Sequence, residues 1–187
     1  STMDSRKRKK SDIDIHANLT VHSGVKAFIE LDKSAGNVAS LSGDGNVNLH
    51  FRPSKAVFDL NGDFSIREGN YQFVLPGILS KDFSVAEGSS IKFGGDIADT
   101  ELDINVIYKQ KASLSALGSE ESKTGTKRLV ECGMSVTDRL RNPKIGFSVE
   151  VPDLDPTTKS LVEAALSTED KVQKQFMALL LMGSFIP

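Results

Sequence analysis

Residues 55–108 alternate apolar and polar side chains through a series of short runs. In the first run, Phe58, Leu60, Phe64 and Ile66 share one parity, and Asp, Asn and Ser occupy most of the positions between them. Successive side chains of a β-strand point to opposite faces of a sheet. The period therefore predicts strands with one apolar face and one solvated face.

Short segments rich in Gly, Asn and Ser separate these runs. We expect turns at 68–70, 87–89 and 94–95, and a break in the pattern at 76–77. Short turns of this composition join antiparallel neighbours in a sheet. The pattern predicts an antiparallel meander in which the apolar face recurs from strand to strand.

Alternation continues on both sides of this segment. A loop rich in Ser, Gly, Glu and Lys is expected at 113–126, because the alternation is lost there. Further strands are expected at 12–21, 25–31, 47–51, 130–136 and 145–151.

The period becomes helical near the C-terminus. Asp155 and Pro156 are typical of a helix start, because Asp caps the first turn and Pro is tolerated within it. Ser167 or Thr168 is expected to cap a second helix, and Gly183 to end it. We expect the second helix to bury its apolar stripe against an end of the sheet: Phe176, Leu179 and Leu180.

These patterns divide the chain into three parts. Residues 1–10 contain five consecutive basic residues and are interpreted as a cloning remnant followed by a basic arm. Residues 11–152 are expected to form the antiparallel sheet, whose apolar face can be covered if the sheet closes into a barrel, folds into a sandwich or curls into a trough. Residues 153–187 are expected to form a C-terminal helical segment. The longest apolar run, Phe176 to Met182, is much shorter than the roughly 18 residues that a spanning helix needs.

Composition argues against several classes of partner. The formal net charge of −2 provides no general basic field for nucleic acid, so no nucleic-acid partner is expected. Aromatic residues make up 6% of the chain and include no Trp, which favours apolar lining over carbohydrate or base stacking. The only cysteine, Cys132, excludes an internal disulfide and is interpreted as a small buried hydrophobe.

No catalytic or metal-binding constellation is evident in the sequence. Asp12 and Asp14 share a parity but lack a third ligand at loop spacing, so an exposed strand face is the preferred interpretation. His16, His22 and His50 show no compact zinc spacing. No nucleophile lies near a base, and the chain is expected to be neither an enzyme nor the carrier of a cofactor.

An ordered set of residues carries a family resemblance. It comprises Gly62, Phe64, Ile66, Gly69, Tyr71 and Phe73, then Phe83, Val85, Gly88, Ser89, Ile91, Phe93, Gly94 and Gly95, then Leu102, Asp103, Ile104 and Tyr108. The tail adds the leucine-rich run 178–183, which ends in glycine. This set resembles the C-terminal domain of the TamB family, the inner-membrane-anchored subunit of the translocation and assembly module of Gram-negative envelopes.

The resemblance implies an elongated trough with an apolar inner surface, in the periplasm between the inner and outer membranes. It implies assembly of outer-membrane and secreted proteins together with a TamA-like outer-membrane barrel protein. It also implies transport of phospholipids across the periplasm. The expected partners are therefore that barrel protein, phospholipid acyl chains and β-strand segments of client proteins.

The expected fold is all-β: an elongated antiparallel meander curled into a trough (a β-taco or half-barrel) with an apolar interior, plus one or two short C-terminal helices. Moving one CH₂ group of an acyl chain from water into such an interior gains about 0.8 kcal/mol. Two alternatives stay open: these side chains fill a dry core, or the chain is a structural or adhesive β module with a closed core. The residues expected to line the groove are Phe58, Leu60, Phe64, Ile66, Tyr71, Phe73, Phe83, Val85, Ile91, Phe93, Leu102, Ile104 and Val106.

Overall fold

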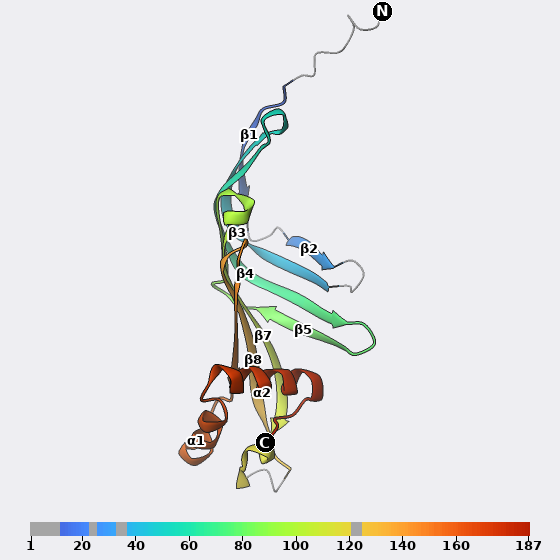
Figure 1. Ribbon diagram of the computed structural model, residues 1–187, viewed down its shortest axis with the longest axis vertical. Coiled ribbons are helices and arrows are strands. Elements are labelled where there is room, and N and C mark those ends of the chain that lie inside the picture. Colours follow the sequence, from blue (N-terminus) through green and yellow to red (C-terminus); the bar gives the residue numbers. More distant parts are fainter. Residues whose placement is uncertain (1–11, 23–25, 33–36, 121–124) are drawn as a thin grey trace, which may run out of the picture.

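The computed structural model describes residues 12–22, 26–32, 37–120 and 125–187, and the basic arm predicted at 1–10 lies outside them. The described residues form nine β-strands in one antiparallel sheet, with two α-helices near the C-terminus (Figure 1). The strands are β1 (Ile15–Val21), β2 (Lys26–Asp32), β3 (Asn37–Arg52), β4 (Val57–Leu75), β5 (Leu79–Val85), β6 (Ser90–Asp96), β7 (Glu101–Ser113), β8 (Lys127–Arg139) and β9 (Lys144–Glu150), and the helices are α1 (Pro156–Ala165) and α2 (Glu169–Met182).

The sheet is elongated and open. Its main strand order is β1-β3-β4-β5-β7-β8-β9, so β1 and β9 form the outer strands of that path and do not pair with each other. β2 also pairs with β3, and β6 pairs with both β4 and β7. Two positions across the sheet are thus each filled by two short strands placed end to end. The predicted all-β architecture, with an open curled sheet and C-terminal helices, is confirmed.

Two of the predicted turns are wrong. β4 runs without interruption through residues 68–70, where a turn was expected, and β6 contains both Gly94 and Gly95. The chain reverses after β6 at a 3-10 turn, Ile97–Asp99. The Asp96 side chain caps the N-terminus of this turn by accepting a hydrogen bond from the Ala98 amide. The turns at 76–77 and 87–89 are confirmed.

A β-bulge explains how β4 passes through the mispredicted turn. In the register with β3, Ser42 faces Glu68 and Gly43 faces Ile66, which leaves Arg67 as the extra residue. A bulge changes the parity of the strand that contains it. Ile66 therefore lies on the same face as Gly69 and Tyr71, and the apolar face continues along β4.

The helix boundaries follow local signals. The Asp155 side chain accepts a hydrogen bond from the Thr158 amide at the start of α1, and Pro156 occupies the first turn. Thr168 caps α2 by accepting from the Lys171 amide. Gly183 ends α2 in a left-handed conformation, with φ 71°, which glycine adopts without steric cost. Both predicted helices and their caps are confirmed.

The loop expected at 113–126 begins one residue later than predicted, because β7 extends to Ser113. Leu114 directly follows β7 and is 2% exposed, so the described start of this connection is packed into the core. Residues 121–124 lie outside the part of the chain that the structure describes.

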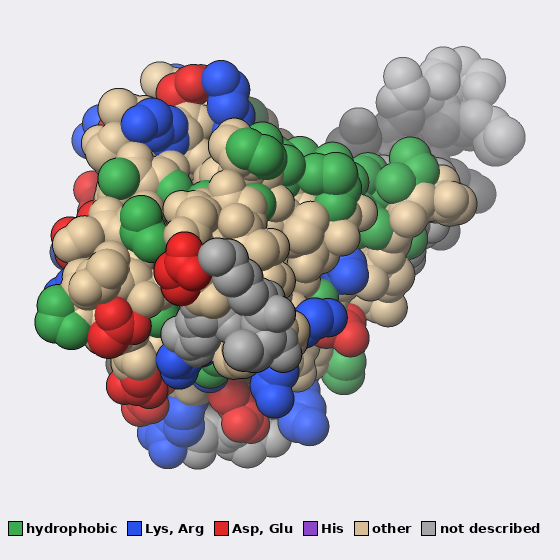
Figure 2. Space-filling view, turned by 90° about the horizontal axis from the view of Figure 1, so that it is seen from below, with side chains coloured by type: hydrophobic (Ala, Val, Ile, Leu, Met, Phe, Trp, Pro, Cys, Tyr) green, Lys and Arg blue, Asp and Glu red, His purple; other side chains and the backbone are tan. Residues whose placement is uncertain are grey.

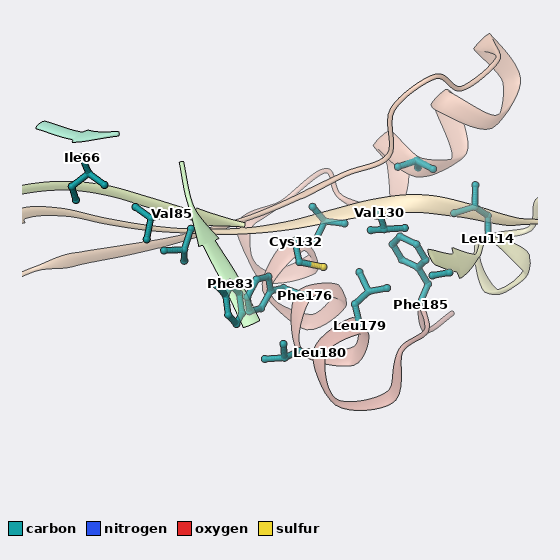
Figure 3. Packing of buried hydrophobic residues seen from close by; sticks show 14 of the residues in the cluster. Ile66, Phe83, Val85, Leu114, Val130, Cys132, Phe176, Leu179, Leu180 and Phe185 are labelled. Carbon is teal, nitrogen blue, oxygen red and sulfur yellow. The ribbon is translucent and has the colours of Figure 1, made fainter. Parts of the chain in front are cut away.

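The main hydrophobic cluster lies between α2 and the lower half of the sheet (Figure 3). Phe176, Leu179 and Leu180 are buried, as predicted, and the ring of Phe176 lies 4.9 Å from that of Phe147 on β9. The Gln110 side chain of β7 donates a hydrogen bond to the Leu179 carbonyl oxygen at 2.9 Å. The helix is therefore held on the sheet by apolar packing and by this hydrogen bond.

Cys132 belongs to this cluster and is fully buried, as predicted. Burial raises the pKa of its thiol to about 11, because the thiolate loses its hydration there. At pH 8 only about one thiol in a thousand would be ionised, and thiolate is the reactive form.

We expect iodoacetamide at pH 8 to leave Cys132 unmodified in the native chain and to alkylate it fully in denaturant. Mass spectrometry of the intact chain, with and without urea, measures both extents. Rapid alkylation of the native chain would show that β8 and α2 separate readily.

Candidate apolar binding face

One face of the sheet carries most of the apolar residues of its strands, and we call it the inner face. Strand register defines it, because directly paired residues in an antiparallel sheet project from the same side. In one row, Ile15 of β1 pairs with Phe51 of β3, which pairs with Phe58 of β4. In another row, Val85 of β5 pairs with Val106 of β7 and Val106 with Met134 of β8.

The register places every residue predicted to line the groove on this inner face. They differ in how far they are covered. Four belong to the buried cluster: Ile66, Phe83, Val85 and Val106. Five pack against that cluster while partly buried: Phe64, Tyr71, Phe73, Ile91 and Ile104. The remaining four lie outside it: Phe58, Leu60, Phe93 and Leu102.

Away from α2, the inner face has no covering element among the described residues. We call this part the open section and define it by eight of the inner-face apolar residues outside the cluster: Ile15, Leu19, Phe51, Phe58, Leu60, Phe93, Leu102 and Ile145. Four of them are substantially exposed: Ile15 by 43%, Leu19 by 48%, Phe58 by 47% and Ile145 by 58%. Sequence reasoning did not assign Ile15, Leu19, Phe51 or Ile145 to the lining, although their alternation was recognisable.

The sheet divides into two arms below the open section. β5 pairs with β7 only at Ser84–Ile107 and Val85–Val106, so the rest of β5 stays with β4 while β7 continues with β8. Aromatic rings lie where the two arms separate. The ring centroids of Phe83 and Tyr108 are 5.8 Å apart, and Nζ of Lys81 lies 5.3 Å from the centroid of the Tyr108 ring. Figure 1 shows β2, β3, β4 and β5 fanning away from β7 and β8.

The arm of β2–β5 is apolar on one side. Seen along the long axis from the helical end, hydrophobic side chains gather along one side of this arm, and charged side chains lie mainly elsewhere (Figure 2). An apolar ligand could bury its surface against such a face but would find few hydrogen-bond partners there. The face would therefore bind ligands because they are apolar and would distinguish little between their shapes.

The opposite, outer face is mainly polar, although Phe28, Ile107 and Leu129 lie on it. Cross-strand pairing there brings together residues that are distant in sequence. His16 on β1 is the register partner of His50 on β3, and their rings stack with centroids 4.0 Å apart. Asp14 lies beside both rings. No spacing in the sequence pointed to this cluster, because the pairing of β1 with β3 skips over β2.

Together these features define a trough-shaped, open β module with an apolar face that a C-terminal helix covers at one end. A family model described as the TamB C-terminal domain matches residues 1–187, the whole chain. The chain therefore belongs to the TamB C-terminal domain family, and its role is a TamB-like one in assembly of the Gram-negative cell envelope.

Comparison with curated proteins and with solved structures found no match to this chain. Among the described residues, no helix has both the length and the apolar character required to span a membrane.

Proposed function

We propose that the inner face carries phospholipid acyl chains in the periplasm, as part of a non-enzymatic module that also takes part in assembly of outer-membrane and secreted proteins. The observation that carries this proposal is the open section, where Ile15, Leu19, Phe58 and Ile145 expose 43–58% of their surface. Exposed apolar patches rimmed by polar residues are typical of interaction sites, because leaving them in water is costly.

The chemistry of the inner face suits an acyl chain. Its rows are built mainly of aliphatic and aromatic residues, and the polar residues among them are Lys81 on β5, Gln110 on β7 and Asp138 and Arg128 on β8. A long acyl chain needs continuous apolar contact and no hydrogen-bond partners along its length. Each CH₂ transferred from water contributes about 0.8 kcal/mol, which adds up to roughly 12 kcal/mol for a long chain.

Strand edges that have no partner strand among the described residues favour the role in protein assembly. β9 is an outer strand of the sheet, and an exposed edge can pair with another strand through backbone hydrogen bonds. A β-strand segment of a client, or of a TamA-like outer-membrane barrel protein, has the required chemistry. Such a segment would place its own apolar side chains next to those of the inner face.

A charge on the inner face tests the lipid proposal. We expect Phe93→Arg to reduce phospholipid crosslinking to a photoreactive residue at position 60 by about tenfold, because a guanidinium is costly to desolvate beside acyl chains. The unfolding midpoint should change little, because Phe93 lies outside the buried cluster and Arg can extend to water. Both quantities are measured on the same samples.

The matched control is Asp63→Arg, because Asp63 is exposed and pairs with Lys92 on the outer face. This variant should leave the crosslinking unchanged and should lower the midpoint only slightly, because the new guanidinium would face Lys92 at an exposed position. A collapsed midpoint for Phe93→Arg would instead favour a structural or adhesive module with a closed, dry core. Unchanged crosslinking in a folded Phe93→Arg variant would overturn the lipid path.

A further inference from the structure

Three potential metal ligands converge on the outer face near the start of the sheet. Asp14, His16 and His50 offer one carboxylate oxygen and two imidazole nitrogens, all within 4.8 Å of one another. Asp14 and His16 are two residues apart and therefore project from the same side of the chain. His50 reaches them because it is the direct cross-strand partner of His16.

The distances suit a tetrahedral ion. The Oδ1 atom of Asp14 lies 2.9 Å from Nε2 of His50 and 3.4 Å from Nε2 of His16. Ligand bonds of about 2.0 Å in a tetrahedron place neighbouring ligand atoms roughly 3.3 Å apart. The two carboxylate–imidazole distances are thus close to the spacing that one shared ion requires. The stacked rings of His16 and His50 would have to turn so that both Nε2 lone pairs point at that ion.

We propose that Asp14, His16 and His50 bind a Zn²⁺ ion, with a fourth coordination position open to water. Two imidazoles and one carboxylate form a ligand set that zinc accepts, whereas Ca²⁺ and Mg²⁺ prefer sites made of oxygen atoms. Before the ion binds, the Nε2–H group of His50 donates a hydrogen bond to the Asp14 carboxylate. Zinc binding displaces the proton from Nε2 to solvent, the neutral ring takes a proton from solvent on Nδ1, and the Nε2 lone pair of each ring forms the bond to zinc.

The surrounding charges favour a cation at this position. Arg52, the nearest basic neighbour along β3, is paired with Asp12 at 2.5 Å, which leaves the Asp14 carboxylate to the two histidines. Asp59 on β4 is the register partner of His50 and adds a negative charge on the same face. The ligand side chains remain accessible to solvent, with exposures of 69% for His16 and 36% for His50.

Zinc at this site would fasten the edge of the sheet. β1 is the outer strand of the main path and pairs only with β3 among the described strands. Asp14 and His16 come from β1 and the residue just before it, and His50 comes from β3. One ion would therefore link β1 to its neighbour independently of the ladder hydrogen bonds.

Isothermal titration of the chelator-treated, untagged chain with ZnCl₂ tests the proposal. We expect one ion per chain with a Kd on the order of 10 µM or tighter, as befits three protein ligands. His16→Ala and His50→Ala should each weaken binding by about 30-fold or more, because each removes one of three ligand bonds. Hydrogen exchange of the β1 amides should slow on addition of zinc to the unaltered chain but not to the His50→Ala variant.

His22→Ala is the matched control, because His22 is exposed, close in sequence and outside the cluster. Its affinity for zinc should equal that of the unaltered chain, and CaCl₂ should produce no binding in any variant. All ligand variants should keep their unfolding midpoint without metal, because the side chains are at the surface. The proposal is overturned if zinc fails to bind, if His22→Ala weakens binding as much as His16→Ala, or if calcium binds equally well.

Discussion

Replacing Leu179 with Ala should lower the free energy of unfolding by about 3 kcal/mol, because a buried leucine loses its apolar contacts and leaves a cavity. Leu179 is fully buried between α2 and the sheet, and Gln110 donates to its backbone carbonyl. Chemical denaturation followed by circular dichroism measures the change. We also expect the variant to bind more of a dye that recognises apolar surface, because a loosened α2 exposes the inner face beneath it.

Leu181→Ala is the control on the same helix, since Leu181 is 51% exposed. Its free energy of unfolding should change by less than about 0.5 kcal/mol, as is usual for surface substitutions. Equal effects of the two substitutions would contradict the placement of α2 on the sheet. The two variants make the same Leu-to-Ala change on the same helix, so any difference between them reports the difference in burial.

Gly43→Ala should destabilise the chain by about 3 kcal/mol, because overpacking that backbone cannot relieve is costly. A Cβ atom at Gly43 would lie 2.0 Å from the Ser65 carbonyl oxygen and 2.9 Å from the Ser65 carbonyl carbon. Both contacts are with backbone, so β3 and β4 would have to move apart beside the bulge at Arg67. The unfolding midpoint in urea measures the loss.

Gly94→Ala is the matched control within the same sheet. Its Cβ would meet nothing closer than the Asp99 carbonyl oxygen at 4.0 Å, and Gly94 does not have a positive φ. The substitution should be neutral or should stabilise by up to about 1 kcal/mol, because alanine restricts the unfolded chain more than glycine does. A large loss at Gly94 together with tolerance at Gly43 would disprove the close approach of β3 to β4.

Features that depend on neighbouring residues were predictable from the sequence. The helix starts at Asp155 and Thr168 and the helix end at Gly183 were correct because capping is decided within one turn. The alternation around Phe58 and Ile66 identified the inner face for the same reason, because the parity of a strand is a local property. Whether acyl chains occupy that face stays a prediction.

Features that depend on pairing between strands were not predictable. The residues 68–70 have the composition of a turn, yet β4 continues through them because β3 pairs with it from Val57 to Gln72. The apolar positions change from even numbers up to Ile66 to odd numbers from Tyr71, which suggested two separate strands. The extra residue of the bulge at Arg67 produces the same change within one strand. His16 lies beside His50 because β1 pairs with β3. A single sequence does not indicate which strand β1 will pair with.

The end-to-end placement of short strands has a consequence for how the chain folds. Among the described strands, each pairing joins neighbours in sequence or strands separated by a single strand. The β3–β4 register begins at Arg52 and Val57, beside the connecting turn, and can close row by row out to Val38 and Gln72. Short loops are entropically cheap to close, and local contacts speed folding. A chain delivered gradually from one end could therefore add each strand to a growing edge, without waiting for a distant partner to arrive.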